Sequence, residues 1–292
     1  MTTASETTLP VDTPESPFVS TEWLAANLGA PDLVVVDASW HMPASGRSGA
    51  TEYLAEHIPG AVHFDIDTIA DHSTPLPHML PDAHSFAIAV GALGIGDGQR
   101  IVVYDSLGLF SAPRVWWTFQ AFGARDVKLL EGGLPRWKAE DRPLEDGPVR
   151  RLPARFTPRF DHSQVADIDR VEQALKTGSA QVLDARQAAR FHGEAPEPRE
   201  GLPSGHMPGS LNLPHGGLVQ DGRLLPPDEL RKAIVASGLD LSRPVITTCG
   251  SGVSAAILWV ALEMIGARPL ALYDGSWTEW GASGKAIAVR ES

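Results

Sequence analysis

The sequence of 292 residues contains a single cysteine, Cys249, so no disulfide can form within the chain. Zinc sites built on pairs of cysteines are excluded for the same reason, and no His-Glu-x-x-His segment is present. We therefore expect no metal centre. A chain without disulfides is typical of a reducing compartment, which predicts a cytoplasmic protein.

Long hydrophobic runs are also missing. The most apolar stretch, 255–267, is interrupted by Glu263 and is too short to span a bilayer. Residues 1–17 are rich in Thr, Ser and Pro and lack the basic start and apolar run of a signal peptide, so they predict a disordered tail. Basic residues are outnumbered, which gives a formal net charge of −12. This acidity argues against nucleic acid or a membrane as a partner.

The length predicts two domains, and the two halves of the chain resemble each other. Matching segments are His57-Ile58-Pro59-Gly60 with His206-Met207-Pro208-Gly209, Val34-Val35-Val36-Asp37-Ala38 with Gln181-Val182-Leu183-Asp184-Ala185, and Ser111-Ala112-Pro113-Arg114-Val115-Trp116-Trp117 with Ser254-Ala255-Ala256-Ile257-Leu258-Trp259. A repeat of this length indicates a duplicated domain. We predict domains at 18–147 and 163–292, joined by a proline-containing linker at 148–162.

Each half alternates short apolar runs with helical patterns. In the second half the strands are expected near 181–184, 211–213, 244–248 and 269–272, and the helices near 167–176, 227–237 and 254–265. This alternation predicts an α/β fold, with a mainly parallel sheet flanked by helices on both faces of each domain. Trp116, Trp117 and Trp259 belong to matching helices and are predicted to lie in the core.

Cys249 opens the loop Cys249-Gly250-Ser251-Gly252-Val253-Ser254, between a predicted strand and a predicted helix. Ligands bind parallel sheets at the carboxyl ends of the strands, and a helix N-terminus favours an anion there. We therefore expect a thiolate nucleophile rather than a small buried hydrophobe. Gly250 and Gly252 would let successive N–H groups surround the thiolate, although an ordinary turn would also accept glycine.

This loop resembles that of the mercaptopyruvate-using members of the rhodanese family. The resemblance extends over nearly the whole chain after residue 18 and includes Asp37-Ala38-Ser39-Trp40, His57-Ile58-Pro59-Gly60, Arg190-Phe191, Glu197-Pro198-Arg199-Glu200-Gly201 and Tyr273-Asp274-Gly275-Ser276-Trp277. It departs at Ser254, where the family usually has Thr. It implies two tandem rhodanese-like domains and a sulfurtransferase without a cofactor. Such an enzyme carries sulfur from 3-mercaptopyruvate, as a persulfide on Cys249, to a thiol or cyanide and releases pyruvate.

The resemblance also implies the roles of individual residues. Arg190 and Arg199 match positions that bind the substrate carboxylate, next to Gly250, Gly252 and Val253. Asp67 and His78 match positions of a proton relay in which Ser251 would be the third member. Sequence spacing alone would favour an ordinary loop histidine at His78, which lies among Pro75, Pro77 and Pro81.

Asp105 aligns with Cys249 in the first half, so the first domain is predicted to be catalytically silent. His57 and His206 start the same turn in both halves, and Asp37 and Asp184 each end a strand. Since these pairs also occur in the silent half, we interpret them as structural.

The charge of the cysteine loop indicates which sulfur donor is used. Thiosulfate-type loops of this family carry two cations where this sequence has Gly250 and Ser251, which favours 3-mercaptopyruvate. The alternatives are a thiosulfate:cyanide sulfurtransferase and a non-enzymatic sulfur carrier or interaction module. A cysteine phosphatase is disfavoured because Ala255 stands where phosphate-binding arginine is needed. With no second cysteine, sulfur must leave to an external acceptor, such as a small thiol or thioredoxin.

Overall fold

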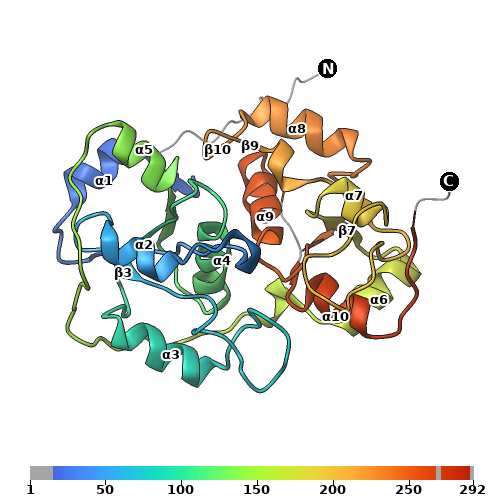
Figure 1. Cartoon of the computed structure of the whole chain (residues 1–292), viewed down its shortest axis with the longest axis horizontal. Helices are drawn as coiled ribbons and strands as arrows, with labels where there is room; N and C mark the ends of the chain where they lie inside the picture. The colour runs from blue at the N-terminus through green and yellow to red at the C-terminus, as the bar shows by residue number, and fades with distance from the viewer. Residues whose placement is uncertain (1–15, 268–270, 290–292) are drawn as a thin grey trace.

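The computed structural model describes residues 16–267 and 271–289 and consists of two domains that lie side by side (Figure 1). The first half of the chain, blue to green, forms one domain, and the second half, yellow to red, forms the other. Within the described residues, no helix is long and apolar enough to cross a membrane.

The first domain contains a five-stranded sheet in the order β1-β5-β4-β2-β3, and all its pairs are parallel. Its strands are β1 (Phe18–Val19), β2 (Leu33–Asp37), β3 (Val62–His63), β4 (Arg100–Tyr104) and β5 (Val127–Leu130). Its helices are α1 (Thr21–Asn27), η1 (Pro43–Ser45), α2 (Gly49–Ala55), α3 (Ala83–Ala92), α4 (Ala112–Ala121) and α5 (Gly133–Ala139).

The second domain repeats this arrangement with the order β6-β12-β11-β7-β8, again entirely parallel. Its strands are β6 (Val165–Ala166), β7 (Gln181–Asp184), β8 (Leu211–Asn212), β11 (Val245–Thr248) and β12 (Ala271–Tyr273), and a separate antiparallel hairpin is formed by β9 (Val219–Gln220) and β10 (Arg223–Leu224). Its helices are η2 (His162–Gln164), α6 (Ile168–Thr177), α7 (Ala188–Phe191), η3 (His215–Gly217), α8 (Pro227–Ala236), α9 (Ala255–Met264) and α10 (Ser276–Ala282).

Both faces of each sheet are buried. Along β2, Val34 and Val36 belong to one hydrophobic core, whereas Leu33 and Val35 belong to another on the opposite face. Successive side chains of a strand point to opposite faces, so a strand that is apolar at every position requires cover on both. The predicted α/β fold of two tandem domains, each with a parallel sheet between helices, is confirmed.

The two domains share a core through α4 and α9, which lie together between them in Figure 1. Trp117 and Trp259 meet there with ring centroids 6.2 Å apart. Trp116, Trp117 and Trp259 are all buried, as the sequence predicts. Because α4 and α9 pack against sheets as well as against each other, almost every residue of both helices is buried.

A second contact joins the domains through two glycines. A Cβ atom on Gly108, in the loop after β4, would lie 2.5 Å from the Cα atom of Gly222 in the β9–β10 hairpin. Both glycines have positive φ, at +98° and +72°. The two backbones can approach this closely only because neither residue has a side chain.

The predicted linker is fixed to the first domain along most of its length. The Ala154 N–H donates to the Gly91 carbonyl at 2.9 Å, and the Arg159 N–H donates to the Phe122 carbonyl at 2.8 Å. Phe156 is buried among aromatic rings of α3 and α4. The connection between the domains is therefore a packed strap.

The predicted tail, 1–17, lies outside the described residues except for its last two positions. Ser16 is buried, its carbonyl accepts from the Lys128 ammonium at 2.5 Å, and the Pro17 carbonyl accepts from the Leu129 N–H at 2.7 Å. These two residues belong to the fold, because they carry the chain into the edge of the sheet beside β5.

Candidate active site

Cys249 lies directly after β11 and six residues before α9, at the carboxyl edge of the sheet, and only 2% of its surface is exposed. Its N–H donates to the Ser276 hydroxyl at 3.3 Å, and its carbonyl accepts from the Trp277 N–H at 2.9 Å. The Gly250 carbonyl accepts from the N–H and the hydroxyl of Thr278, at 2.9 and 2.7 Å. The first turn of α10 therefore anchors the loop at the cysteine.

The equivalent loop of the first domain shows what such a loop can hold. The Asp105 carboxylate, at the position of Cys249, accepts hydrogen bonds from four backbone N–H groups at 2.7–2.9 Å. Burial raises the pKa of Asp105, and these amide hydrogen bonds oppose the rise. A loop of this shape thus gathers N–H donors around an acidic group at its first position, which is the geometry expected around a thiolate or persulfide.

Asp67, His78 and Ser251 form a hydrogen-bonded chain across the domain boundary. Asp67 Oδ1 lies 2.9 Å from His78 Nε2, and His78 Nδ1 lies 3.2 Å from Ser251 Oγ. The hydrogen bond from His78 lowers the pKa of Asp67, and the Trp40 indole N–H, which donates to Asp67 at 2.7 Å, adds to this effect against burial. The structure brings together three residues whose contact the sequence spacing could not establish.

Arg199 reaches the same serine from the other side. Its Nη2 donates to Ser251 Oγ at 3.3 Å, and among the described residues it forms no ion pair with a carboxylate. Burial lowers the pKa of Arg199, whereas the nearby Cys249 opposes the decrease. Most of the N–H groups of this guanidinium therefore remain available to an anionic ligand beside the cysteine.

Arg190 is more constrained. Its Nε lies 3.2 Å from Glu197 Oε2, and its Nη2 also donates to that oxygen. The other Glu197 oxygen accepts from the buried Arg186 at 2.8 Å, and Arg186 pairs in turn with Asp184 at 2.7 Å. The edge of the Arg190 guanidinium formed by Nε and Nη2 is thus occupied by Glu197. Sequence reasoning missed Arg186, although its place two residues after the end of β7 was a usable signal.

The loop glycines allow arginines to approach the backbone. A Cβ atom on Gly250 would lie 3.4 Å from Arg190 Nη2, and one on Gly252, where φ is +78°, would lie 2.7 Å from Arg114 Nη1. The role of Val253 in substrate binding stays a prediction. Its side chain is buried in the same hydrophobic core as Cys249, so a ligand beside the cysteine would contact the backbone of Val253.

The residues interpreted as structural make internal contacts. His57 and His206 each donate from Nδ1 to a backbone carbonyl, at 2.7 and 2.9 Å. Asp37 accepts from the Ser39 N–H, and Asp184 accepts from the Arg186 N–H, both at 2.8 Å.

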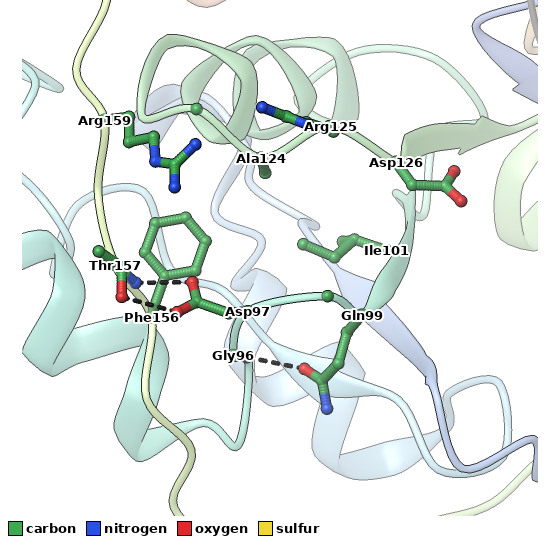
Figure 2. A pocket seen from close by; sticks show the side chains of 12 residues that line it. Gly96, Asp97, Gln99, Ile101, Ala124, Arg125, Asp126, Phe156, Thr157 and Arg159 are labelled. Atoms are coloured by element: carbon green, nitrogen blue, oxygen red, sulfur yellow. Dashed lines mark hydrogen bonds between the residues drawn. The ribbon is translucent and has the colours of Figure 1, made fainter.

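A separate cavity of about 600 Å³ opens on the first domain (Figure 2). Its lining includes Gln99, Phe156 and Arg159. The Asp97 carboxylate, which also lines it, accepts hydrogen bonds from the N–H and the hydroxyl of Thr157. None of the residues predicted for the site lines this cavity, so it is distinct from the cluster of residues around Cys249.

Comparison with known proteins shows the family of this chain. The family model of the rhodanese-like domain matches residues 20–140 and again residues 167–283. The chain belongs to the rhodanese family. As a two-domain rhodanese, it is 44% identical over 266 residues to a 3-mercaptopyruvate sulfurtransferase of Escherichia coli K12, an alignment that covers 91% of this chain and 95% of the relative.

Two further relatives extend the comparison. A thiosulfate sulfurtransferase of Bos taurus is 42% identical over 271 residues, covering 90% of this rhodanese and 91% of the relative. The crystal structure of SseA from Escherichia coli, described as a 3-mercaptopyruvate sulfotransferase, matches with a TM-score of 0.83 at 41% identity, covering 90% of this chain and 99% of that one. The recognition of a two-domain rhodanese and the prediction of a sulfurtransferase are confirmed.

Proposed function

We propose that this protein takes sulfur from 3-mercaptopyruvate, holds it as a persulfide on Cys249 and passes it to an external thiol or cyanide. The hydrogen-bonded chain from Asp67 through His78 to Ser251 carries this proposal. A proton route next to the nucleophile is needed when a carbon leaving group must be protonated, as with mercaptopyruvate. The relatives named for this activity support the same donor.

The first half-reaction forms one S–S bond and breaks one C–S bond. The Cys249 thiolate attacks the sulfur of 3-mercaptopyruvate, an S–S bond forms, and the C–S bond breaks with its electron pair on the pyruvate enolate. The proton that leaves the thiol group of the substrate is passed to this carbon by way of Ser251, His78 and Asp67, which gives pyruvate and leaves the persulfide as an anion. Backbone N–H groups of the loop stabilise the persulfide anion, in the way that four N–H groups hold Asp105.

The substrate carboxylate is proposed to bind between Arg199 and the free edge of Arg190. Guanidinium groups bind carboxylates through parallel hydrogen bonds, and the absence of side chains at Gly250 and Gly252 leaves the backbone accessible. In the second half-reaction an acceptor thiolate attacks the outer sulfur and regenerates the Cys249 thiolate. The acceptor is proposed to be a small thiol, cyanide or reduced thioredoxin, and the cysteine content supports a cytoplasmic setting.

The test is the intact mass of the protein after incubation with 3-mercaptopyruvate. We expect the wild type to gain one sulfur atom and to release pyruvate repeatedly when a thiol is supplied. Cys249→Ser should gain none and should keep its circular dichroism spectrum. An unmodified wild-type thiol contradicts the proposal, and pyruvate release that stops after one equivalent favours a sulfur carrier.

A thiosulfate-preferring enzyme is the alternative, and one observation favours it. Although Gly250 and Ser251 are uncharged, Arg190 and Arg199 lie beside Gly250 and could together attract a dianion. Initial rates with both donors at equal concentrations separate the two functions. A kcat/KM for thiosulfate equal to or above that for 3-mercaptopyruvate would reverse the assignment of the donor.

A further inference from the structure

Arg114 crosses from the first domain into the catalytic domain. It begins in α4, between the domains in Figure 1, and 2% of its surface is exposed. Its Nη2 donates to the His78 carbonyl at 2.6 Å and to Asp274 Oδ1 at 2.5 Å, while its guanidinium lies 4.7 Å from the Trp117 ring centroid. A charge this deeply buried is retained only with a partner, and Asp274 is that partner.

The pair of Arg114 and Asp274 holds the segment that carries His78 at both ends. Arg114 binds the His78 carbonyl, and the second oxygen of Asp274 accepts from the Leu80 N–H at 2.8 Å. His78 has a positive φ of 62°, which is unfavourable for a residue with a side chain. Such a backbone conformation persists only where surrounding contacts fix it, and these two hydrogen bonds are such contacts.

The same pair also contacts the catalytic loop. Arg114 Nη1 packs against Gly252, and within the described part of the chain this buried nitrogen has no hydrogen-bond partner. Asp274 lies two residues before Ser276, whose hydroxyl accepts from the Cys249 N–H. One buried ion pair therefore connects the histidine of the proton chain with the loop of the nucleophile.

We propose that Arg114 is a positioning residue that sets His78 against Ser251, and so aligns the proton route with Cys249. Arg114 acts through His78 and does not contact the substrate. The inference depends on the proposed mercaptopyruvate reaction for its kinetic test, since only that donor requires a proton at carbon. When thiosulfate is the donor, the leaving group is sulfite and no carbon is protonated. The activity with thiosulfate is therefore the internal comparison.

The test compares Arg114→Met with the double variant Arg114→Met/Asp274→Asn. The single variant leaves the Asp274 charge buried without a partner and can fail to fold, whereas the double variant removes both charges. In the folded double variant we expect kcat for 3-mercaptopyruvate to fall about 10- to 100-fold, with a smaller change in KM and a far smaller loss with thiosulfate. Arg114→Lys, which can restore one of the two contacts, should recover part of the loss.

Arg100→Met is the control, because Arg100 pairs with Asp32 on the same domain and begins β4, at the end of the strand opposite to the Asp105 loop. It should leave the ratio of the two donor activities unchanged. An equal fall with both donors in the double variant would show a purely structural role and overturn the inference. If the wild type releases no pyruvate, the proposed function fails by itself. Nitrogen-15 shifts of the His78 ring then test the inference alone, and shifts unchanged in the double variant would overturn it.

Discussion

Asp105 and Cys249 occupy the same place in two copies of one loop, and the Asp105 carboxylate accepts hydrogen bonds from four backbone N–H groups. The first domain thus keeps a carboxylate where the second domain has its cysteine, the proposed nucleophile. One copy of the loop uses its N–H donors to hold the Asp105 carboxylate, and the other copy is proposed to use them to stabilise a persulfide.

Replacing Asp105 by Asn should therefore destabilise the protein without removing its activity. The amide retains one acceptor but turns a donor toward the converging N–H groups. The expected loss in the free energy of unfolding is about 1–3 kcal/mol, the cost of a buried donor without a partner. Urea denaturation measures it, with the exposed Asp126→Asn as control. A stability equal to that of the control would contradict the role given to Asp105.

The proton chain predicts a difference between donors. His78→Gln and Ser251→Ala should lower kcat for 3-mercaptopyruvate by about 10²- to 10⁴-fold, the usual contribution of positioned acid–base groups. With thiosulfate the effect should be small, because no carbon is protonated. Steady-state kinetics with both donors measures the difference. Equal losses would indicate that these residues shape the loop and do not move a proton.

The two arginines beside Gly250 should not be equivalent. Arg199→Ala should raise KM for 3-mercaptopyruvate by roughly 10- to 150-fold, which corresponds to about 1.5–3 kcal/mol for a charged hydrogen bond. Arg190→Ala should raise it less, because Glu197 already occupies one edge of Arg190. The reverse order would mean that Glu197 releases Arg190 when substrate binds. Arg190→Lys, which keeps the charge, separates charge from geometry.

Glu52 predicts how stability depends on pH in the first domain. Burial disfavours its charge, but hydrogen bonds from Arg47, His41 and Ser106 outweigh burial and lower the pKa of Glu52 to about 2. A lowered carboxyl pKa stabilises the fold above the ordinary value of 4.5. That stabilisation is lost as the pH falls toward about 2, and it amounts to about 1–2 kcal/mol after allowance for solvent screening.

Glu52→Gln should therefore be less stable than the wild type at neutral pH, and its stability should decrease less between about pH 5 and pH 2. Thermal unfolding over this pH range is the measurement, with the exposed Glu229→Gln as the matched control. Parallel curves for wild type and Glu52→Gln would show that Glu52 does not contribute to the acid sensitivity.

Local sequence signals predicted much of the fold and indicated a candidate nucleophile. The apolar run at β11, the glycines of the loop and the apolar helix after it point to Cys249 without information from elsewhere in the chain, and its catalytic role stays a prediction. The repeated segments predicted two similar sheets, because a duplicated sequence buries its apolar residues in the same pattern. The linker boundaries at 148–162 stay a prediction, and the packing of this segment against α3 and α4 depends on long-range contacts that no sequence periodicity predicts.

The parts of the site that come from the first domain were harder to predict. His78 meets Ser251 across 173 positions of sequence, so only the family resemblance suggested their contact. Arg114 was missed as a contributor, although it stands where the second domain has Ile257 in the matching helix. A charged residue that replaces an apolar one in a buried helix signals a buried partner, and this signal could have identified it.

The near-complete burial of Cys249 determines which acceptors can reach it. A flat protein surface could not bring its own thiol within bonding distance of a sulfur atom that is buried to this extent. If the acceptor is a macromolecule, we therefore expect it to present its thiol on a narrow projecting loop, a requirement that cyanide and small thiols would not have. Competition between large and small acceptors for the same loaded enzyme would thus report steric access more than intrinsic nucleophilicity.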